Sequence, residues 1–137
     1  MEFHGVKIAC VFEDKLLVHL RDNKAGLFNA NKWDFPGGGR EGIETVFECA
    51  QREVKEEFGI VISPEKTIWE KEYPAQKDPS QKAVFLVTTI SKADVDAIVL
   101  GEGQCWDLMG FQTFFSHTDV IDALKARFRD YLLTQSL

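Results

Sequence analysis

The sequence predicts one α/β domain spanning residues 1–137, in which strands lie before and after a central helix and a second helix closes the chain. Residues 44–58 and 119–133 place apolar side chains at helical spacing, and the segments around the first are short, apolar and β-prone. The 137-residue chain is close to the commonest length of one domain and has no Gly/Ser-rich linker or internal repeat. We therefore expect an α/β sandwich folded as one unit.

The first strands are expected to form a hairpin. Residues 6–12 and 16–20 are apolar and β-prone, and the polar residues between them suit a short loop. Further along, Pro36 restricts Phe35 to extended backbone conformations, and the glycines at positions 37–39 allow tight turning. A short strand should therefore end at a flexible corner there.

The central helix is expected from residue 44 to residue 58. Its apolar residues follow at intervals of 3, 4 and 4, which places them on one side of a helix: Phe47, Ala50, Val54 and Phe58. Gly59 supplies a natural stop at the C-terminal end.

Three later strands and a last helix complete the predicted fold. Residues 68–73 and 83–90 are predicted as strands around a polar loop that contains proline, and residues 106–109 form a weaker strand candidate. The last helix, residues 119–133, repeats apolar residues every four positions and has Thr118 before it as a candidate N-cap.

The composition is that of an ordinary globular protein, with 45% apolar and 28% charged residues. No segment approaches the ~20 apolar residues of a membrane span, and the start of the chain lacks a basic leader, so a cytoplasmic location is the default expectation. The net charge of −6 disfavours binding to nucleic acid polymers and anionic membranes. Cations are therefore needed where a polyphosphate approaches.

Neither the cysteines nor the histidines are spaced as a metal site. Cys10, Cys49 and Cys105 lie far apart without a CxxC pair, which favours buried free thiols over disulfides or a thiolate zinc site. The three histidines also lack ligand spacing, so we expect ordinary surface or partly buried side chains.

The most informative pattern lies between residues 38 and 60. A glycine is followed after five residues by a glutamate, and after seven more by an R-E-apolar-x-E-E-x-G-apolar segment: Gly38, Glu44, Arg52, Glu53, Val54, Glu56, Glu57, Gly59 and Ile60. On a helix, Glu53 and Glu57 lie one above the other, with Glu56 on the outward side of the same flank. Three carboxylates should therefore converge on one patch.

Such a patch favours a divalent cation, because like charges at these spacings repel by a few tenths of a kcal/mol each and a bound cation reverses the sign. Oxygen ligands suit Mg²⁺, with Mn²⁺ as an acceptable substitute, and a carbonyl of the glycine turn is a further candidate ligand. We expect Arg52 to orient a carboxylate by a charge-assisted hydrogen bond. Glu44, at the start of the helix, is expected to support the glycine loop.

The alternative is a solvated, salt-bridged helix face without chemistry. Nine fixed positions at ordinary residue frequencies are expected by chance in well under about one in a million chains of this length, so the full spacing disfavours this alternative. No Gly-Lys-Ser/Thr follows the glycine turn, and a nucleoside-triphosphatase P-loop is not supported.

The pattern resembles the signature of the Nudix hydrolases, and residues 33–60 resemble small bacterial MutT-like members. This resemblance implies a Nudix-type α/β/α sandwich with a mixed β-sheet between helices. It also implies Mg²⁺-dependent cleavage of a pyrophosphate bond in a nucleoside diphosphate linked to a group X, by attack of water on phosphorus.

The matching positions make Glu53, Glu56 and Glu57 metal ligands, with Gly37 offering its carbonyl oxygen and Gly38 supporting the site. The general base varies within the family between a glutamate of the motif and a glutamate of a late loop. The candidates in this chain are therefore Glu53 and Glu102, since Glu-Gly-Gln before a strand with tryptophan resembles the late loop of MutT-like members. The alternative for Glu102 is a solvated loop residue, and the choice of base stays open.

Candidates for substrate binding lie outside the motif. Arg21, at the end of the second strand, is a candidate for binding a terminal phosphate, and Phe28, Trp33 or Phe85 for stacking on a base. For each of these aromatic residues the alternative is packing in the core.

The leading hypothesis for function is hydrolysis of a nucleoside or deoxynucleoside triphosphate, oxidised nucleotides included, to the monophosphate and pyrophosphate. ADP-ribose, a nucleotide sugar or a dinucleotide is the alternative substrate for the same chemistry. A non-catalytic nucleotide-sensing or interaction module on a Nudix scaffold is the alternative from another class, and the complete set of carboxylates disfavours it. The sequence leaves open whether the protein forms a homodimer.

Overall fold

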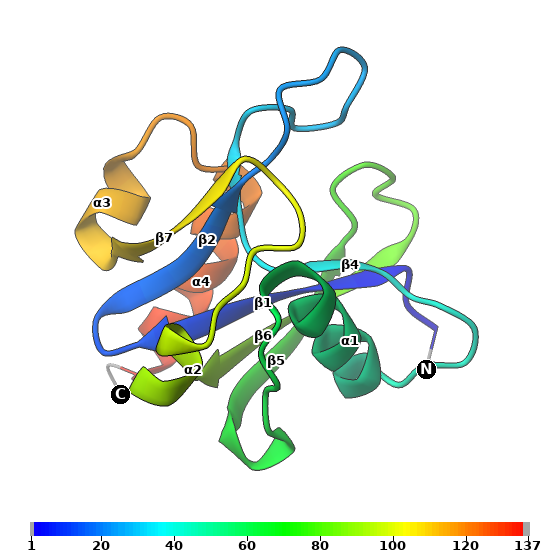
Figure 1. Cartoon of the computed structure of the whole chain (residues 1–137). Helices are drawn as coiled ribbons and strands as arrows, with labels where there is room; N and C mark the ends of the chain where they lie inside the picture. Colours follow the sequence, from blue (N-terminus) through cyan, green and yellow to red (C-terminus); the bar gives the residue numbers. More distant parts are fainter. Residues whose placement is uncertain (1, 136–137) are drawn as a thin grey trace.

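A computed structural model describes residues 2–135, which form a mixed seven-stranded sheet with helices on both faces (Figure 1). The strand at its centre is β1, which pairs in parallel with β6 and in an antiparallel hairpin with β2. Strand β5 lies antiparallel to β6 at the edge, β3 and β7 pair with β2, and β4 pairs with β1. The bounds of the strands are Gly5–Phe12 (β1), Lys15–Leu20 (β2), Trp33–Asp34 (β3), Gly37–Gly39 (β4), Thr67–Pro74 (β5), Lys82–Thr89 (β6) and Cys105–Gly110 (β7).

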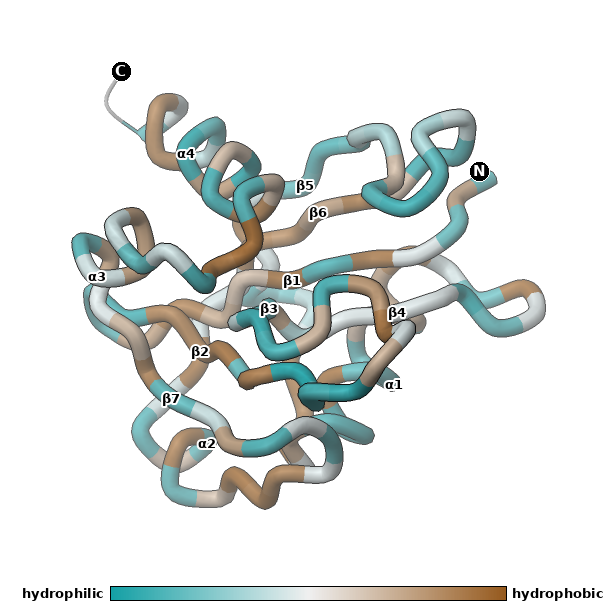
Figure 2. The backbone as a smooth tube through the Cα atoms, turned by 90° about the horizontal axis from the view of Figure 1, so that it is seen from above, coloured by the Kyte–Doolittle hydropathy of each residue, from teal (hydrophilic) through white to brown (hydrophobic). Residues whose placement is uncertain are grey.

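Two apolar clusters, one on each face of the sheet, explain the layered arrangement. One contains the apolar side of α1 (Val46–Phe58), with residues of the α2 region (Lys92–Asp96) packed against it. The other contains buried residues of α3 (Phe111–Ser116) and α4 (Asp122–Gln135). Figure 2 shows α4 on one side of the strands and α2 on the other. The predicted α/β/α sandwich is confirmed.

Helix α1 begins two residues later than the sequence predicted, because Thr45 is its N-cap. The Thr45 side chain accepts a hydrogen bond from Glu48 N, and the Glu48 side chain accepts one from Thr45 N, which is a capping box. Gly59 ends the helix in the left-handed conformation, with φ 71°. Glu44 therefore lies before the helix and not in its first turn.

The later elements confirm the predicted strands and correct the helices. Strands β5, β6 and β7 lie within one residue of their predicted bounds, and β7 pairs with β2 over its whole length. Helix α4 begins at Asp122, three residues after the predicted start, so Thr118 is not its N-cap. Helices α2 and α3 were not predicted, since each has at most six residues and too few turns for a helical pattern to be recognised.

The cysteines are free thiols, and Cys10 and Cys49 are buried as expected. The expectation was wrong for Cys105, which is exposed at the start of the outer strand β7. No helix among the described residues has the length and apolar character needed to cross a membrane.

Candidate active site

The glycine turn and helix α1 meet through glycine positions that leave room for other groups. Strand β4 pairs antiparallel with β1, and a Cβ on Gly37, whose φ is 145°, would collide with the backbone of Val6. A Cβ on Gly38 would lie 2.6–2.8 Å from the carboxylate atoms of Glu53. Only glycine at position 38 therefore allows the Glu53 carboxylate to rest against the turn.

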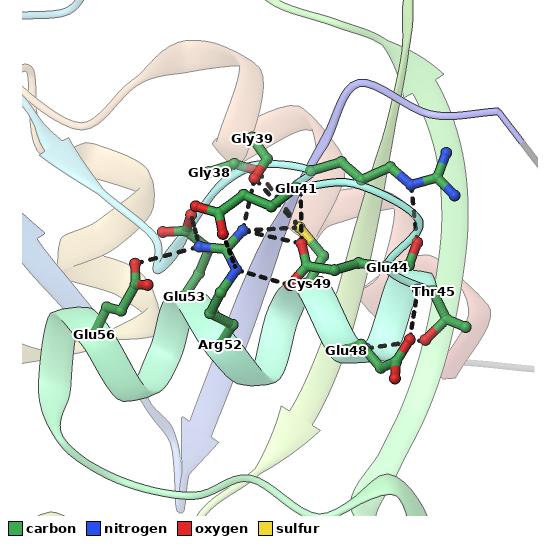
Figure 3. A network of polar contacts seen from close by, with 11 residues as sticks. Gly38, Gly39, Glu41, Glu44, Thr45, Glu48, Cys49, Arg52, Glu53 and Glu56 are labelled. Atoms are coloured by element: carbon green, nitrogen blue, oxygen red, sulfur yellow. Dashed lines mark hydrogen bonds and ion pairs between the residues drawn. The ribbon is translucent and has the colours of Figure 1, made fainter.

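Arg52 joins the glycine turn, the segment before α1 and two glutamates of the helix (Figure 3). Its guanidinium donates to Glu44 Oε2 at 2.7 Å and to Gly39 O at 2.8 Å. It also donates to Glu53 Oε1 at 2.9 Å and to Glu56 Oε2 at 3.2 Å. This arrangement is the orienting geometry expected for Arg52.

Glu44 reaches the turn from outside the helix. Its Oε1 accepts from Glu41 N at 2.8 Å and its Oε2 from Arg52 Nε at 2.7 Å. The hydrogen bond with Arg52 lowers the pKa of Glu44 from 4.5 to about 2. Glu44 thus contacts the glycine turn through Arg52.

Glu57 points into the sheet and is only 2% exposed. Its Oε1 accepts from Gly37 N at 2.8 Å, and its Oε2 lies 3.5 Å from His19 Nε2. Burial raises the pKa of Glu57 to about 8, with Glu53 and Asp34 adding to the rise and Lys7 and the Gly37 amide opposing it. Burial and the neighbouring carboxylates therefore outweigh the charge of Lys7 and the Gly37 amide at this carboxylate.

His19 was expected to be an ordinary surface or partly buried residue, but it is 3% exposed and lies beside Glu57. Burial lowers its pKa. Both ring nitrogens are buried without a hydrogen-bond partner among the described residues. The sequence signal for its burial was a histidine within an otherwise apolar strand. The spacing of residues within α1 gave no indication that His19 contacts this helix.

The loop that follows α2 brings Glu102 to the same region. Gly101 N donates to Glu57 O at 2.8 Å, and a Cβ on Gly101 would collide with Glu56 O, so the loop packs closely on the end of α1. Glu102 is exposed. Burial raises the pKa of Glu53, Arg52 opposes the rise, and the charges of Glu56 and Glu102 add to it. Glu102 therefore lies within electrostatic range of the Glu53 carboxylate.

The three helix carboxylates share a flank but are not gathered around one point. Arg52 holds Glu53 and Glu56, while the Gly37 amide draws Glu57 toward the sheet. Within residues 2–135, no group of three His, Cys, Asp or Glu side chains is arranged to hold a metal ion. The convergence of the three carboxylates on one patch therefore stays a prediction.

The donors themselves fit a hard divalent cation. All three are carboxylates, Glu53 occupies the space that a side chain at position 38 would fill, and burial raises the pKa of both Glu53 and Glu57. A cation at this flank would favour their charged forms. The chemistry of the donor set is therefore compatible with Mg²⁺ or Mn²⁺.

Next to the glycine turn is a cavity of about 440 Å³. Gly38 and Gly39 line it on the side of α1, and Arg21 and Phe28 line it with Arg127 of α4. Arg21 and the neighbouring Leu27 also line a second cavity, which reaches Glu102. Arg21 thus lies between the two cavities, where a phosphate could be bound.

The aromatic candidates for stacking on a base differ in their exposure. Phe28 is 42% exposed and lines the cavity beside the glycine turn. Phe85 is fully buried, with its ring centroid 5.8 Å from Phe35 and 6.0 Å from Trp69. The expectation that Phe85 stacks on a base is wrong, because its ring is enclosed in the core on the α4 side; Trp33 also packs against that core.

Three further residues of the cavity were not recognised in the sequence: Lys7, Asp34 and Arg127. Lys7 interrupts an apolar segment, Arg127 stands between Ala126 and Phe128, and Asp34 stands between two aromatic residues. These interruptions were the available signal. The sequence does not reveal that three distant elements bring them together.

Comparison with known proteins gives the family. The model of the NUDIX domain matches residues 3–135. None of the curated proteins matches the sequence. Among solved structures, the MutT protein of Methanosarcina mazei Go1 is 19% identical, with a TM-score of 0.75 over 99% of this chain and 97% of that one.

Two other structures with the same fold carry different names. A Caenorhabditis elegans Ap4A hydrolase is 15% identical, with a TM-score of 0.69 over 96% of this chain and 98% of that one. A bifunctional NMN adenylyltransferase/ADP-ribose pyrophosphatase of Francisella tularensis, complexed with AMP and a Mn ion, is 18% identical, with a TM-score of 0.59 over 80% of this chain and 34% of that one. Since the family model covers nearly the whole sequence, the chain belongs to the Nudix domain family and is a pyrophosphohydrolase of that family.

Proposed function

We propose that the protein hydrolyses nucleoside or deoxynucleoside triphosphates, oxidised nucleotides included, to the monophosphate and pyrophosphate with Mg²⁺. The observation that carries the proposal is the position of the Glu53 carboxylate, which lies against Gly38, a residue that lines the cavity beside the glycine turn. Metal-binding groups and a space large enough for a nucleoside thus meet at one glycine turn. The cations Lys7 and Arg21 line this cavity in a chain whose net charge is −6.

In this proposal Glu53, Glu56 and Glu57 hold the cation, with the carbonyl oxygen of Gly37 as a further ligand. The cation supplies polarisation of the phosphoryl oxygens and neutralises charge that develops on them. Arg52 fixes the direction of the Glu53 carboxylate through its 2.9 Å hydrogen bond. Arg21 binds a phosphate between the two cavities, and Phe28 packs against the base.

The general base is proposed to be Glu53 or Glu102. Glu102 is exposed on its loop, so a water molecule can reach its carboxylate and transfer a proton to it. Burial raises the pKa of Glu53, and its hydrogen bond with Arg52 opposes that rise. Comparison of kcat and metal affinity for Glu102→Gln and Glu53→Gln separates the two, and an unchanged kcat for Glu102→Gln removes Glu102 from the chemistry.

The test of the function is release of phosphate and pyrophosphate from a nucleotide panel, with Mg²⁺ or with EDTA. The panel includes ADP-ribose, a nucleotide sugar and a dinucleotide, so that it also decides among the alternative substrates. Glu57→Gln is expected to lower kcat by about 10² to 10³, as does loss of one fixed electrostatic group in other active sites. Activity in EDTA, or a Glu57→Gln variant as active as wild type, would falsify the proposed mechanism. Absence of product from every nucleotide of the panel with Mg²⁺ would favour a non-catalytic module.

The same proposal treats residues 1–137 as one functional domain that acts on a small nucleotide. A cytoplasmic location and a homodimer stay predictions. Sedimentation of the purified protein over a range of concentrations decides between monomer and homodimer.

A further inference from the structure

A buried carboxylate oxygen at the cavity beside the glycine turn has no hydrogen-bond partner within residues 2–135. Asp34 lines the cavity and is 2% exposed. Its Oδ2 accepts from Lys7 Nζ at 2.8 Å and from Arg21 Nη1 at 3.2 Å. Its Oδ1 is buried and unpartnered among the described residues. An unpaired oxygen of this kind is unfavourable in the free protein, so a ligand N–H group that reaches it gains a partner without displacing one.

A buried arginine lies at the same cavity. Arg127 is 4% exposed, and no carboxylate in residues 2–135 lies within salt-bridge distance of it. It donates through Nη2 to Pro74 O at 2.9 Å, and its guanidinium carbon lies 4.9 Å from the centre of the Tyr73 ring. Burial lowers its pKa, while Tyr73 and Asp34 oppose the shift. The guanidinium therefore retains N–H donors for a ligand.

The remaining walls of the cavity are suited to a flat ring. Apolar side chains surround the polar pair: Val6, Leu27, Phe28, Ala75 and Ala83. The volume of about 440 Å³ lies in the range of small-ligand pockets. Other polar residues also line the cavity, among them Asn29, Gln76 and Lys77. The unpartnered acceptor of Asp34 and the donors of Arg127 match a nucleobase, which offers both kinds of group along its edge.

We propose that Asp34 and Arg127 determine base specificity, by selecting a nucleobase that carries an exocyclic amino group beside a ring nitrogen or carbonyl oxygen. Asp34 Oδ1 accepts from the amino group, and Arg127 donates to the neighbouring acceptor. The inference rests on the proposed nucleotide substrate. A carboxylate paired with two cations can only accept hydrogen bonds, so an oxo group in place of the amino group sets two acceptors against each other.

The proposal can be tested with pairs of bases that differ only in whether they carry the amino group or an oxo group. Cytosine carries an amino group where uracil carries an oxo group, and adenine and hypoxanthine differ in the same way. Since the change is made on the ligand, wild-type protein alone decides the outcome, whether or not any variant folds.

The experiment is titration calorimetry with CMP, UMP, AMP and IMP in EDTA, where neither metal nor turnover is needed. The amino member of at least one pair should bind about tenfold more tightly than its oxo partner, and Asp34→Asn should remove this difference because an amide offers both a donor and an acceptor. Asp96→Asn, the same change on the exposed surface of α2, should leave all four affinities unaltered.

Equal binding within both pairs, tighter binding of the oxo members, or no binding of any of the four nucleotides overturns the inference. A folded Asp34→Asn protein that keeps the wild-type preference also overturns it. Failure of the proposed function is distinguishable: base discrimination without metal-dependent hydrolysis removes only the enzyme activity, and hydrolysis without discrimination removes only this inference.

Discussion

Two polar regions meet at the glycine turn, and they differ in how completely their charged groups are paired. On the α1 side, Arg52 donates to Glu44, Glu53 and Glu56 as well as to Gly39 O. On the cavity side, within the described part of the chain, a buried oxygen of Asp34 has no hydrogen-bond partner and Arg127 forms no salt bridge. The first region is a connected network, whereas the second retains unmatched hydrogen-bonding groups.

The difference indicates a division of labour. A network that is satisfied within the protein holds side chains in one orientation, which is what groups that take part in chemistry need. Unmatched groups cost stability in the free protein, and they gain partners only when a ligand arrives. We therefore expect substitutions on the α1 side to lower kcat and stability, and substitutions in the cavity to change the choice of ligand.

Outside the glutamates themselves, the largest effect is expected for Gly38→Ala, which places a methyl group in the space of the Glu53 carboxylate, 2.6 Å from Oε1. Displacing a catalytic group by about 1 Å lowers rates by about 100-fold, so kcat should fall by that order while the fold is kept. Steady-state kinetics with Mg²⁺, together with circular dichroism, measures both.

The matched control is Gly39→Ala in the same strand. No atom lies within 4 Å of a Cβ at position 39, so its kcat should stay close to wild type. If both variants lose activity equally, the glycine turn is sensitive as a whole and the specific contact with Glu53 is not the reason.

Substitution of Arg52 and of Arg127 should change the free energy of unfolding by different amounts. Arg52→Met leaves Glu44, Glu53 and Glu56 without their donor, and loss of charged hydrogen bonds of this kind costs about 2–3 kcal/mol. Arg127→Met replaces a buried cation by an apolar chain of similar length, so its free energy of unfolding should lie within about 1 kcal/mol of wild type or above it. Urea denaturation checks both, and a larger loss for Arg127→Met contradicts the comparison.

A smaller effect, of about 1.5 kcal/mol at neutral pH, is expected for Glu44→Gln. The pKa of Glu44 falls from 4.5 to about 2 on folding, so its contribution is complete above pH 4.5 and is lost as the pH falls toward 2. The difference in unfolding free energy between wild type and Glu44→Gln should therefore shrink across that interval. A constant difference would mean that the charge of Glu44 is not the cause.

Local patterns explain which parts of this molecule can be predicted from the sequence. The 3-4-4 spacing and Gly59 predict α1 because both act within one helix, and the alternating apolar segments predict the strands. The start of α1 was misplaced because Glu44 and Thr45 are both plausible first residues, and only the capping box decides between them.

The cavity depends on contacts between distant segments, which no local pattern contains. Asp34 comes from β3, Lys7 from β1 and Arg127 from α4, and their neighbours in sequence are apolar. The same reason explains Phe85: as an aromatic residue of a strand it suits either a base or the core, and only the packing of Phe35 and Trp69 against it decides.

The most direct test of the division between the two regions is the ratio of kcat/KM for CTP to kcat/KM for UTP, measured with Mg²⁺ in wild type, Glu57→Gln and Asp34→Asn. The account predicts that Glu57→Gln lowers both values by the same factor and keeps the ratio, while Asp34→Asn brings the ratio toward one. A Glu57→Gln variant with an altered ratio, or an Asp34→Asn variant that keeps the wild-type preference, would contradict it.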